Sequence, residues 1–109
     1  MIPIEIHSEA FDEIEGAIRW YDERAEGLGI KFEKELDHAV ACIRDCPDTW
    51  SKYVSGTRRF FLNRFPFAVV YLYDGTKIRI FAVMHLRRKP GYWRKKNELT
   101  LGHIMRTIR

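Results

Sequence analysis

Residues 67–84 read FAVVYLYDGTKIRIFAVM, and this stretch is the most informative part of the sequence about the fold. Its two halves are rich in aromatic and β-branched residues, which are typical of strands. Between them, Asp74 and Gly75 are a strong signal for a tight turn, because glycine tolerates a positive φ. The stretch therefore predicts a β-hairpin with strands at 67–73 and 77–84.

Alternation along the second strand assigns its side chains to two faces of a sheet. One face carries Ile78, Ile80, Ala82 and Met84. The other carries Lys77, Arg79, Phe81 and Val83, with His85 next in line. We expect one face to pack on helices and the other to be mixed, cationic and at least partly open.

Two apolar stripes at helical spacing precede the hairpin. The first comprises Phe11, Ile14, Ile18, Tyr21 and Ala25, and the second comprises Phe32, Leu36, Ala39 and Ile43. Ser8 is the expected N-cap of the first helix, with Glu9 at the positive helix end. Gly27 and Gly29 separate the stripes, and Pro47 ends the second, because proline cannot continue the hydrogen-bond ladder. So short a connection predicts an αα-hairpin.

The order of these segments defines the fold class. A short strand at 2–7 comes first, and a strand at 58–64 precedes the β-hairpin. The order β-α-α-β-β-β predicts an α+β domain, with a two-helix hairpin packed on a mostly antiparallel sheet. A chain of 109 residues holds one domain, which we place at 1–96. Residues 97–109 form either a short helix or a loosely held tail.

Charge is distributed unevenly along the chain. Residues 1–50 carry 13 acidic and 5 basic side chains, whereas residues 51–109 carry 14 basic and 2 acidic ones. The halves thus have net charges of −8 and +12, which sum to the +4 of the whole chain. Such asymmetry favours a polyanionic partner for the basic half, and a merely dipolar surface is the alternative.

Several classes of protein can be set aside from the sequence. No apolar run approaches a membrane span, and no secretory signal is visible, so a cytoplasmic protein is expected. Cys42 and Cys46 are expected to be reduced, partly buried helix residues. No motif for a nucleophilic serine, a phosphate-binding loop or a zinc site is present. We therefore expect no metal and no cofactor.

The remaining chemistry depends on cations, histidine and tyrosine. These suffice for metal-free cleavage of RNA, in which a base, an acid and fixed positive charge assist attack of a 2′-hydroxyl on its own phosphate. His85 could act as base or acid, although a histidine at a strand end is often structural. Tyr92 or Trp93 either stacks on a base or closes the core. Strand alternation further predicts that Arg58 and Arg64 lie on one face.

Four segments together resemble the RelE/ParE superfamily of toxins from bacterial toxin–antitoxin modules, often called plasmid stabilisation proteins. They are EAFDEIEGAIRWYDE, LGIKFEKELDHAVACIRDCPDTW, RRFFLNRFPFAVVY and IRIFAVMHLRRKPGYW. The resemblance covers residues 2–95 and implies the β-α-α-β-β-β fold. It also implies a toxin whose active surface is covered by a partner antitoxin. RelE-like members cleave mRNA on the ribosome without a metal, whereas ParE-like members poison DNA gyrase.

The resemblance also implies roles for single residues. Arg87 matches the phosphate-stabilising arginine after the last strand of RelE-like nucleases, and their C-terminal aromatic falls near Tyr92 or Trp93. Their third-strand arginine falls on Ala68, which is a departure. A lysine pair found in some nucleases is represented only by Lys52.

Three hypotheses follow, with RNA cleavage slightly favoured. The chain is a metal-free mRNA endonuclease, a gyrase-directed toxin that acts by protein binding, or an inactive relative that only binds an antitoxin. The expected catalytic residues are His85, Arg87, Arg88, Arg64 and Tyr92. The expected substrate-binding residues are Lys52, Arg58, Trp93 and Lys89. The expected partners are a cognate antitoxin and either the ribosome with mRNA or DNA gyrase.

Overall fold

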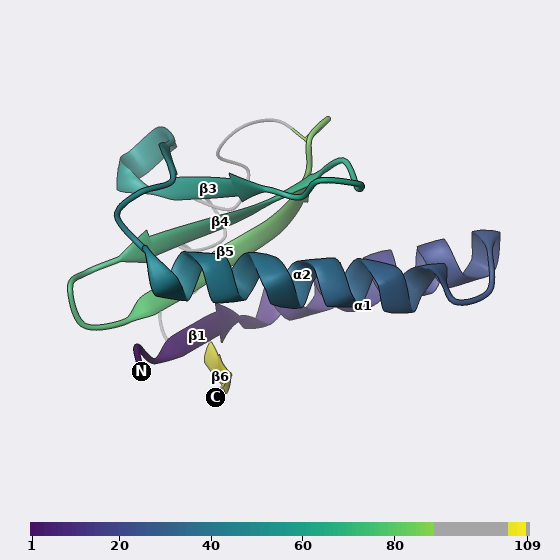
Figure 1. The fold of residues 1–109 in the computed structure, drawn as a ribbon, viewed down its shortest axis with the longest axis horizontal. Coiled ribbons are helices and arrows are strands. Elements are labelled where there is room, and N and C mark those ends of the chain that lie inside the picture. The colour runs from purple at the N-terminus through teal and green to yellow at the C-terminus, as the bar shows by residue number, and fades with distance from the viewer. Residues whose placement is uncertain (89–104, 109) are drawn as a thin grey trace.

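The structure is a computed structural model, and it describes residues 1–88 and 105–108. Two long helices run across one face of a sheet (Figure 1). In chain order the elements are β1 (Ile4–His7), α1 (Ser8–Arg24), α2 (Leu28–Asp45), β2 (Ser51–Lys52), a 3₁₀ turn (Val54–Gly56), β3 (Arg58–Phe61), β4 (Phe67–Tyr73), β5 (Ile78–His85) and β6 (Met105–Ile108). The predicted α+β class and its helix hairpin on a sheet are confirmed.

The sheet has the strand order β2-β3-β4-β5-β1-β6. Strands β1 and β5 pair in parallel, and every other neighbouring pair is antiparallel. Strand β6 lies within residues 97–109, for which the sequence predicts a short helix or a tail. That expectation is wrong for Met105–Ile108, whose backbone pairs with β1. Strand pairing with a distant segment leaves no periodic signal in so short a stretch.

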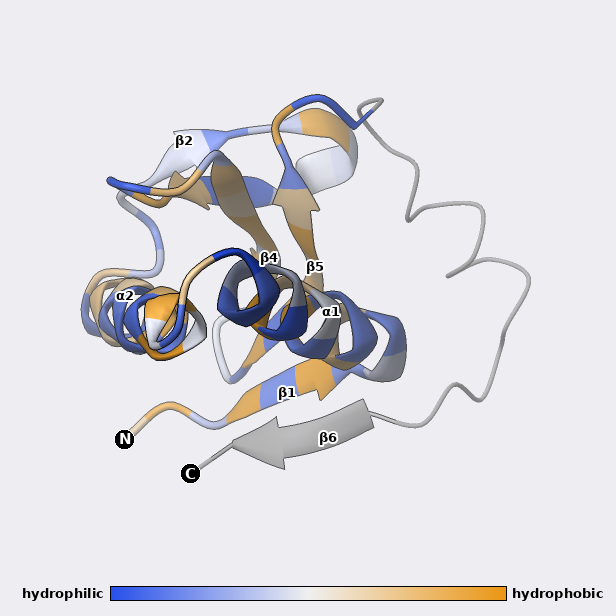
Figure 2. Cartoon of the chain, turned by 90° about the vertical axis from the view of Figure 1, so that its right-hand side faces the viewer, coloured by the Kyte–Doolittle hydropathy of each residue, from blue (hydrophilic) through white to orange (hydrophobic). Residues whose placement is uncertain are grey.

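The core between helices and sheet is built from the predicted stripes, and Figure 2 shows both helices against the same side of the sheet. Phe32, Leu36, Ala39 and Ile43 of α2 are all buried. Ala25 is exposed instead, because α1 ends at Arg24. Gly29 allows the helices to approach closely, since a Cβ there would lie 2.6 Å from the carbonyl oxygen of Ile18.

The first turn of α1 is capped differently from the expectation. The sequence predicts Ser8 as the N-cap, but Ser8 is the first helical residue and His7 is the cap. Nδ1 of His7 accepts a hydrogen bond of 3.2 Å from the backbone N–H of Glu9. The imidazole of His7 thus accepts the hydrogen bond that a serine hydroxyl commonly accepts at a helix N-terminus.

The outward alternation of β5 is interrupted by a β-bulge at Phe81. Tyr71 of β4 pairs with Ile80, but its neighbour Val70 pairs with Ala82, so Phe81 has no partner. Beyond the bulge, Ala82 and Met84 face away from the helices, while Val83 joins the core beneath them. The predicted division of 77–85 into two faces is therefore wrong after residue 80.

The end of α2 is anchored to the sheet by two hydrogen bonds to backbone carbonyls. Trp50 donates its indole N–H to the carbonyl of Cys42 over 3.2 Å, and the Tyr71 hydroxyl donates to the carbonyl of Pro47 over 2.7 Å. The pKa of Tyr71 is raised to about 12, chiefly by burial, with Arg58 opposing the rise and Asp48 adding to it.

Within residues 1–88 and 105–108, no helix is both long and apolar enough to cross a membrane.

Candidate functional site

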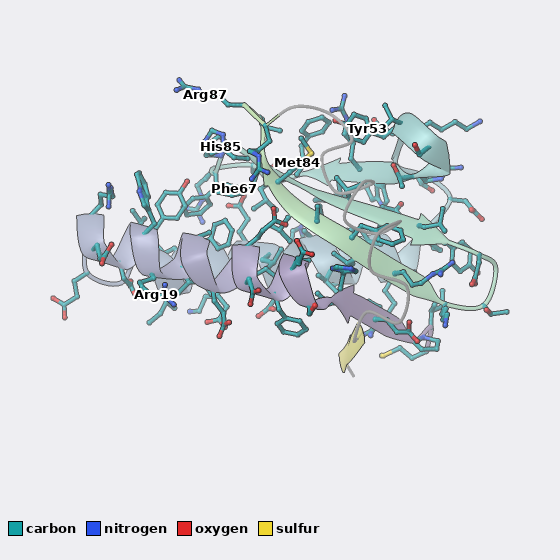
Figure 3. All side chains as sticks on the ribbon, turned by 180° about the vertical axis from the view of Figure 1, so that it is seen from behind. Arg19, Tyr53, Phe67, Met84, His85 and Arg87 are labelled. Carbon is teal, nitrogen blue, oxygen red and sulfur yellow. The ribbon has the colours of Figure 1, made fainter. Side chains whose placement is uncertain are left out.

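A groove of about 570 Å³ lies between α1 and the ends of β4 and β5. Gly16, Trp20, Phe67, Val83, His85 and Arg88 are among its lining residues. Figure 3 shows His85 and Phe67 side by side at the end of the sheet, with Arg87 projecting beyond them. Two of the predicted site residues, His85 and Arg88, thus line the same groove.

The bulge in β5 creates this groove by turning His85 toward α1. Strand β1 pairs with β5 only at Ile78, Arg79 and Ile80, so among the described residues the backbone beyond them has no strand partner on that side. The Glu13 carboxylate of α1 instead accepts a hydrogen bond of 3.1 Å from the N–H of Val83. This bond holds the end of β5 against the helix.

His85 is fixed by contacts on two sides. Its ring meets Phe67 edge-on, with centroids 5.2 Å apart. Its Nδ1 accepts a hydrogen bond of 3.1 Å from the backbone N–H of Arg87, and its carbonyl accepts one of 2.9 Å from the N–H of Arg88. Because Nδ1 is an acceptor, the hydrogen of the neutral ring lies on Nε2. In this arrangement the neutral ring has no free lone pair to offer as a base.

The rim of the groove is both apolar and cationic. Trp20, which lines the groove, is 49% exposed, and Leu86, which lies between the lining residues His85 and Arg88 in the chain, is 45% exposed. The guanidinium of Arg24 stacks 3.5 Å above the Trp20 ring, and Arg87 and Arg88 are exposed at the other end. Exposed aromatic and aliphatic groups among arginines suit the binding of a protein segment that is apolar and acidic.

The other predicted arginines have partners elsewhere in the structure. Strand β3 ends at Phe61, so the alternation that would place Arg64 on the face of Arg58 does not reach it. Arg64 lies in the following loop, where its backbone N–H donates to Glu35 over 2.8 Å and its Nε lies 3.5 Å from the same carboxylate. Arg58 donates to the carbonyl of Trp50 over 2.8 Å. Because β3 ends before Arg64, strand alternation does not place this residue, and the sharing of one face by these arginines stays a prediction.

The centre of the outer sheet face is apolar, not cationic. Ala68, Val70, Ala82 and Met84 form a buried cluster there, and Tyr53, Val54 and Phe81 pack against it. The hydroxyl of Tyr53 donates to Sδ of Met84 over 3.9 Å. The expectation of a mixed, cationic and open face is therefore wrong at its centre.

One cation on this face, Arg59, is not among the residues predicted for the site. The guanidinium of Arg59 lies 4.1 Å from the ring centroid of Tyr53 and 4.7 Å from that of Phe61. Arg59 and Phe61 are two apart in β3, so strand alternation would have placed them together. Tyr53 lies in the segment before β3, and no pattern in the local sequence predicts its contact with Arg59.

The remaining predicted residues divide into two groups. Lys52 is exposed on the two-residue strand β2, at one edge of the sheet. Lys89, Tyr92 and Trp93 lie outside the described residues. Within residues 1–88 and 105–108, no group of three or more His, Cys, Asp or Glu side chains could hold a metal ion.

The element order, the helix hairpin and the bulged sheet define an α+β fold with two helices on one face of a mostly antiparallel sheet. One solved structure that shares this fold is described as the chromosomal ParDE TA system from P. aeruginosa. A chain of that structure matches with a TM-score of 0.69 and 17% sequence identity, over 78% of this chain and 96% of that chain. At this identity the likeness establishes a shared fold. No family model matches this chain, and no curated protein matches its sequence.

Proposed function

We propose that this chain is the toxin of a type II toxin–antitoxin module and acts in the cytoplasm. Two independent likenesses support this proposal. The segment around Arg64 to Tyr71 and the segment from His85 to Trp93 resemble the RelE/ParE superfamily. The matched structure is described as a ParDE TA system.

Between the two targets, we favour DNA gyrase, reached by protein binding, over RNA. The apolar cluster around Ala68 carries this choice. A metal-free nuclease must stabilise a crowded phosphorane with fixed positive charge, which requires cations to converge on one phosphate. RelE-like nucleases place an arginine where this chain has Ala68, and Ala68 is fully buried among Val70, Ala82 and Met84.

The surroundings of His85 support the same choice. A general base needs a free lone pair within reach of the hydroxyl that it deprotonates. The Nδ1 lone pair of His85 is occupied by the Arg87 N–H, and Nε2 carries the hydrogen of the neutral ring. The predicted role of His85 as a base would require this hydrogen bond to break.

RNA cleavage is the second candidate function. The observation that favours it is the placement of His85, Arg87 and Arg88 within one turn at the end of β5. Arg87 is exposed there, as a phosphate-binding arginine must be.

The antitoxin is the partner that we assign to the groove beside α1. The exposed Trp20 of the groove, and the exposed Leu86 next to His85 in the chain, would be covered by apolar side chains of the antitoxin. The arginines at its rim would meet acidic side chains, which steer association as well as contribute affinity.

The test is to induce the protein in cells and to measure plasmid supercoiling, the DNA-damage response and transcript integrity together. Loss of supercoiling control with intact transcripts supports the gyrase target. Cleaved transcripts with normal supercoiling select the nuclease, and unaffected growth selects the inactive relative. Arg87→Ala should reduce toxicity, whereas Arg19→Ala is the charge-matched control, because Arg19 lies on the opposite side of α1 from His85 and Arg87 (Figure 3).

A further inference from the structure

The last two turns of α2 carry a cluster of sulfur and imidazole groups that the proposed function does not use. His38 and Cys42 are four residues apart on α2 and so share one side of the helix, and Cys46 follows as its C-cap. Sγ of Cys42 lies 3.6 Å from Nε2 of His38. Both cysteines are free; Cys42 is half-buried, and Cys46, which the sequence predicts to be partly buried, is exposed.

The two thiols have opposite electrostatic surroundings. His38 is exposed and presents a ring nitrogen to the sulfur of Cys42, so it can take the thiol proton as the sulfur attacks. Sγ of Cys46 instead lies 4.0 Å from the Asp45 carboxylate. A carboxylate beside a sulfur opposes the thiolate, which is the nucleophilic form of cysteine. The less exposed thiol is therefore the better placed to react.

We propose that Cys42 is a thiol-modification site that accepts a low-molecular-weight thiol of the glutathione class from its disulfide. In this exchange, Nε2 of His38 takes the Cys42 proton, and Sγ attacks one sulfur of the disulfide. A new sulfur–sulfur bond forms while the old one breaks, and the leaving thiolate takes the proton from the imidazolium. One disulfide replaces another, so no further oxidant is needed.

The position of Cys42 makes an adduct there relevant to the fold. The carbonyl of Cys42 accepts the last backbone hydrogen bond of α2, from Cys46 over 3.2 Å, and also the indole N–H of Trp50 over 3.2 Å. Trp50 in turn packs edge-on against Phe60 of β3, with centroids 4.7 Å apart. An adduct at Cys42 thus lies at the junction between α2 and the edge of the sheet. The proposal does not depend on the toxin assignment.

The experiment treats the full-length reduced protein with oxidised glutathione and follows each cysteine by peptide mass mapping over time. Cys42 should be modified faster than Cys46, although it is less exposed. His38→Gln should slow Cys42 by about tenfold and flatten the pH dependence of its rate, while leaving Cys46 unchanged. Asp45→Asn is the matched variant, which should accelerate Cys46.

Faster modification of Cys46 in the unaltered protein would overturn the proposal. An unchanged Cys42 rate in the His38→Gln variant would do the same. Because His38 and Asp45 are both exposed, neither substitution removes core packing, and circular dichroism of each variant checks the fold.

Discussion

The backbone N–H of Val83 in β5 donates a hydrogen bond of 3.1 Å to the Glu13 carboxylate of α1. Within the part of the chain that the structure describes, this bond takes the place of a strand partner, because β1 pairs with β5 only as far as Ile80. It also fixes the strand end that carries His85 into the groove. A side chain of α1 therefore accepts a backbone hydrogen bond from the sheet at the candidate site.

Removing this carboxylate should destabilise the protein. Glu13→Ala would leave the N–H of the buried Val83 without its acceptor, which costs about 1–3 kcal/mol. Thermal unfolding monitored by circular dichroism measures the loss. Glu15→Ala is the matched control, since Glu15 is an exposed acid on the same helix. Equal melting temperatures for the two variants would show that this hydrogen bond does not stabilise the folded protein.

Filling the groove should block antitoxin binding without harming the fold. A Cβ at Gly16 meets no atom within 4 Å, and Gly16 lines the groove, so Gly16→Leu has room for its first side-chain atom. Replacing a glycine inside a helix adds about 0.5–1 kcal/mol of helix stability. We expect at least about tenfold weaker binding of the partner protein encoded beside this chain, measured by calorimetry.

Gly16→Ala is the control for that experiment, because it gives the same gain in helix propensity with a smaller side chain. Equal affinities for the leucine and alanine variants would place the antitoxin elsewhere. Loss of binding in both variants would point to the helix backbone instead of the groove. Toxicity of the uncomplexed protein is a separate measurement, so the toxin assignment is tested independently.

Introducing an arginine at Ala68 should unfold the outer face of the sheet and not create a nuclease. Ala68 is fully buried in an apolar cluster, where an unpaired guanidinium costs at least about 3 kcal/mol. Phe61→Arg provides the comparison, because Phe61 is 42% exposed. Denaturant unfolding and a transcript cleavage assay should be run on both proteins. A stable Ala68→Arg variant that cuts RNA would contradict the gyrase assignment.

Stability should fall at alkaline pH because of Tyr71. Burial raises the pKa of this phenol from the ordinary 10.0 to about 12 in the folded protein. Between these values the unfolded chain releases the phenolic proton and the folded chain retains it. Rising pH therefore favours unfolding across that window. Urea unfolding at several pH values from about 9 to about 12 measures the slope.

Tyr71→Phe is the informative variant for this effect. It loses the hydrogen bond to the Pro47 carbonyl, so it should be less stable at neutral pH by about 1 kcal/mol. Its stability should, however, decline less steeply above about pH 10, because the titrating group is gone. An identical alkaline slope in both proteins would assign the decline to other groups.

Local patterns predicted most of the secondary structure. The two apolar stripes became α1 and α2, and the turn at Asp74 and Gly75 joins β4 to β5 as expected. Asp74 stabilises this turn through its own side chain, whose Oδ1 accepts hydrogen bonds from the backbone N–H groups of Thr76 and Lys77. These hydrogen bonds favour the carboxylate and hold the pKa of Asp74 below its ordinary value.

The candidate site was less predictable because its geometry depends on breaks in those patterns. A bulge at Phe81 carries no marker in the local sequence, yet it decides that Val83 and His85 face α1. Strand β3 likewise ends at Phe61, so its alternation does not extend to Arg64. Arg64 contacts Glu35, which lies 29 positions earlier in the chain. Residue type and strand alternation predict neither the bulge at Phe81 nor the contact between Arg64 and Glu35.

Sequence alone specifies the amphipathic helix hairpin, the β-hairpin of β4 and β5 and the concentration of positive charge after residue 50. These properties follow from local backbone preference and from periodicity, which act over a few residues. Only the tertiary structure decided which cations meet, because side chains far apart in the chain become neighbours through strand register and helix packing. It placed His85 and Arg88 on a groove beside Trp20 and enclosed Ala68 in an apolar cluster.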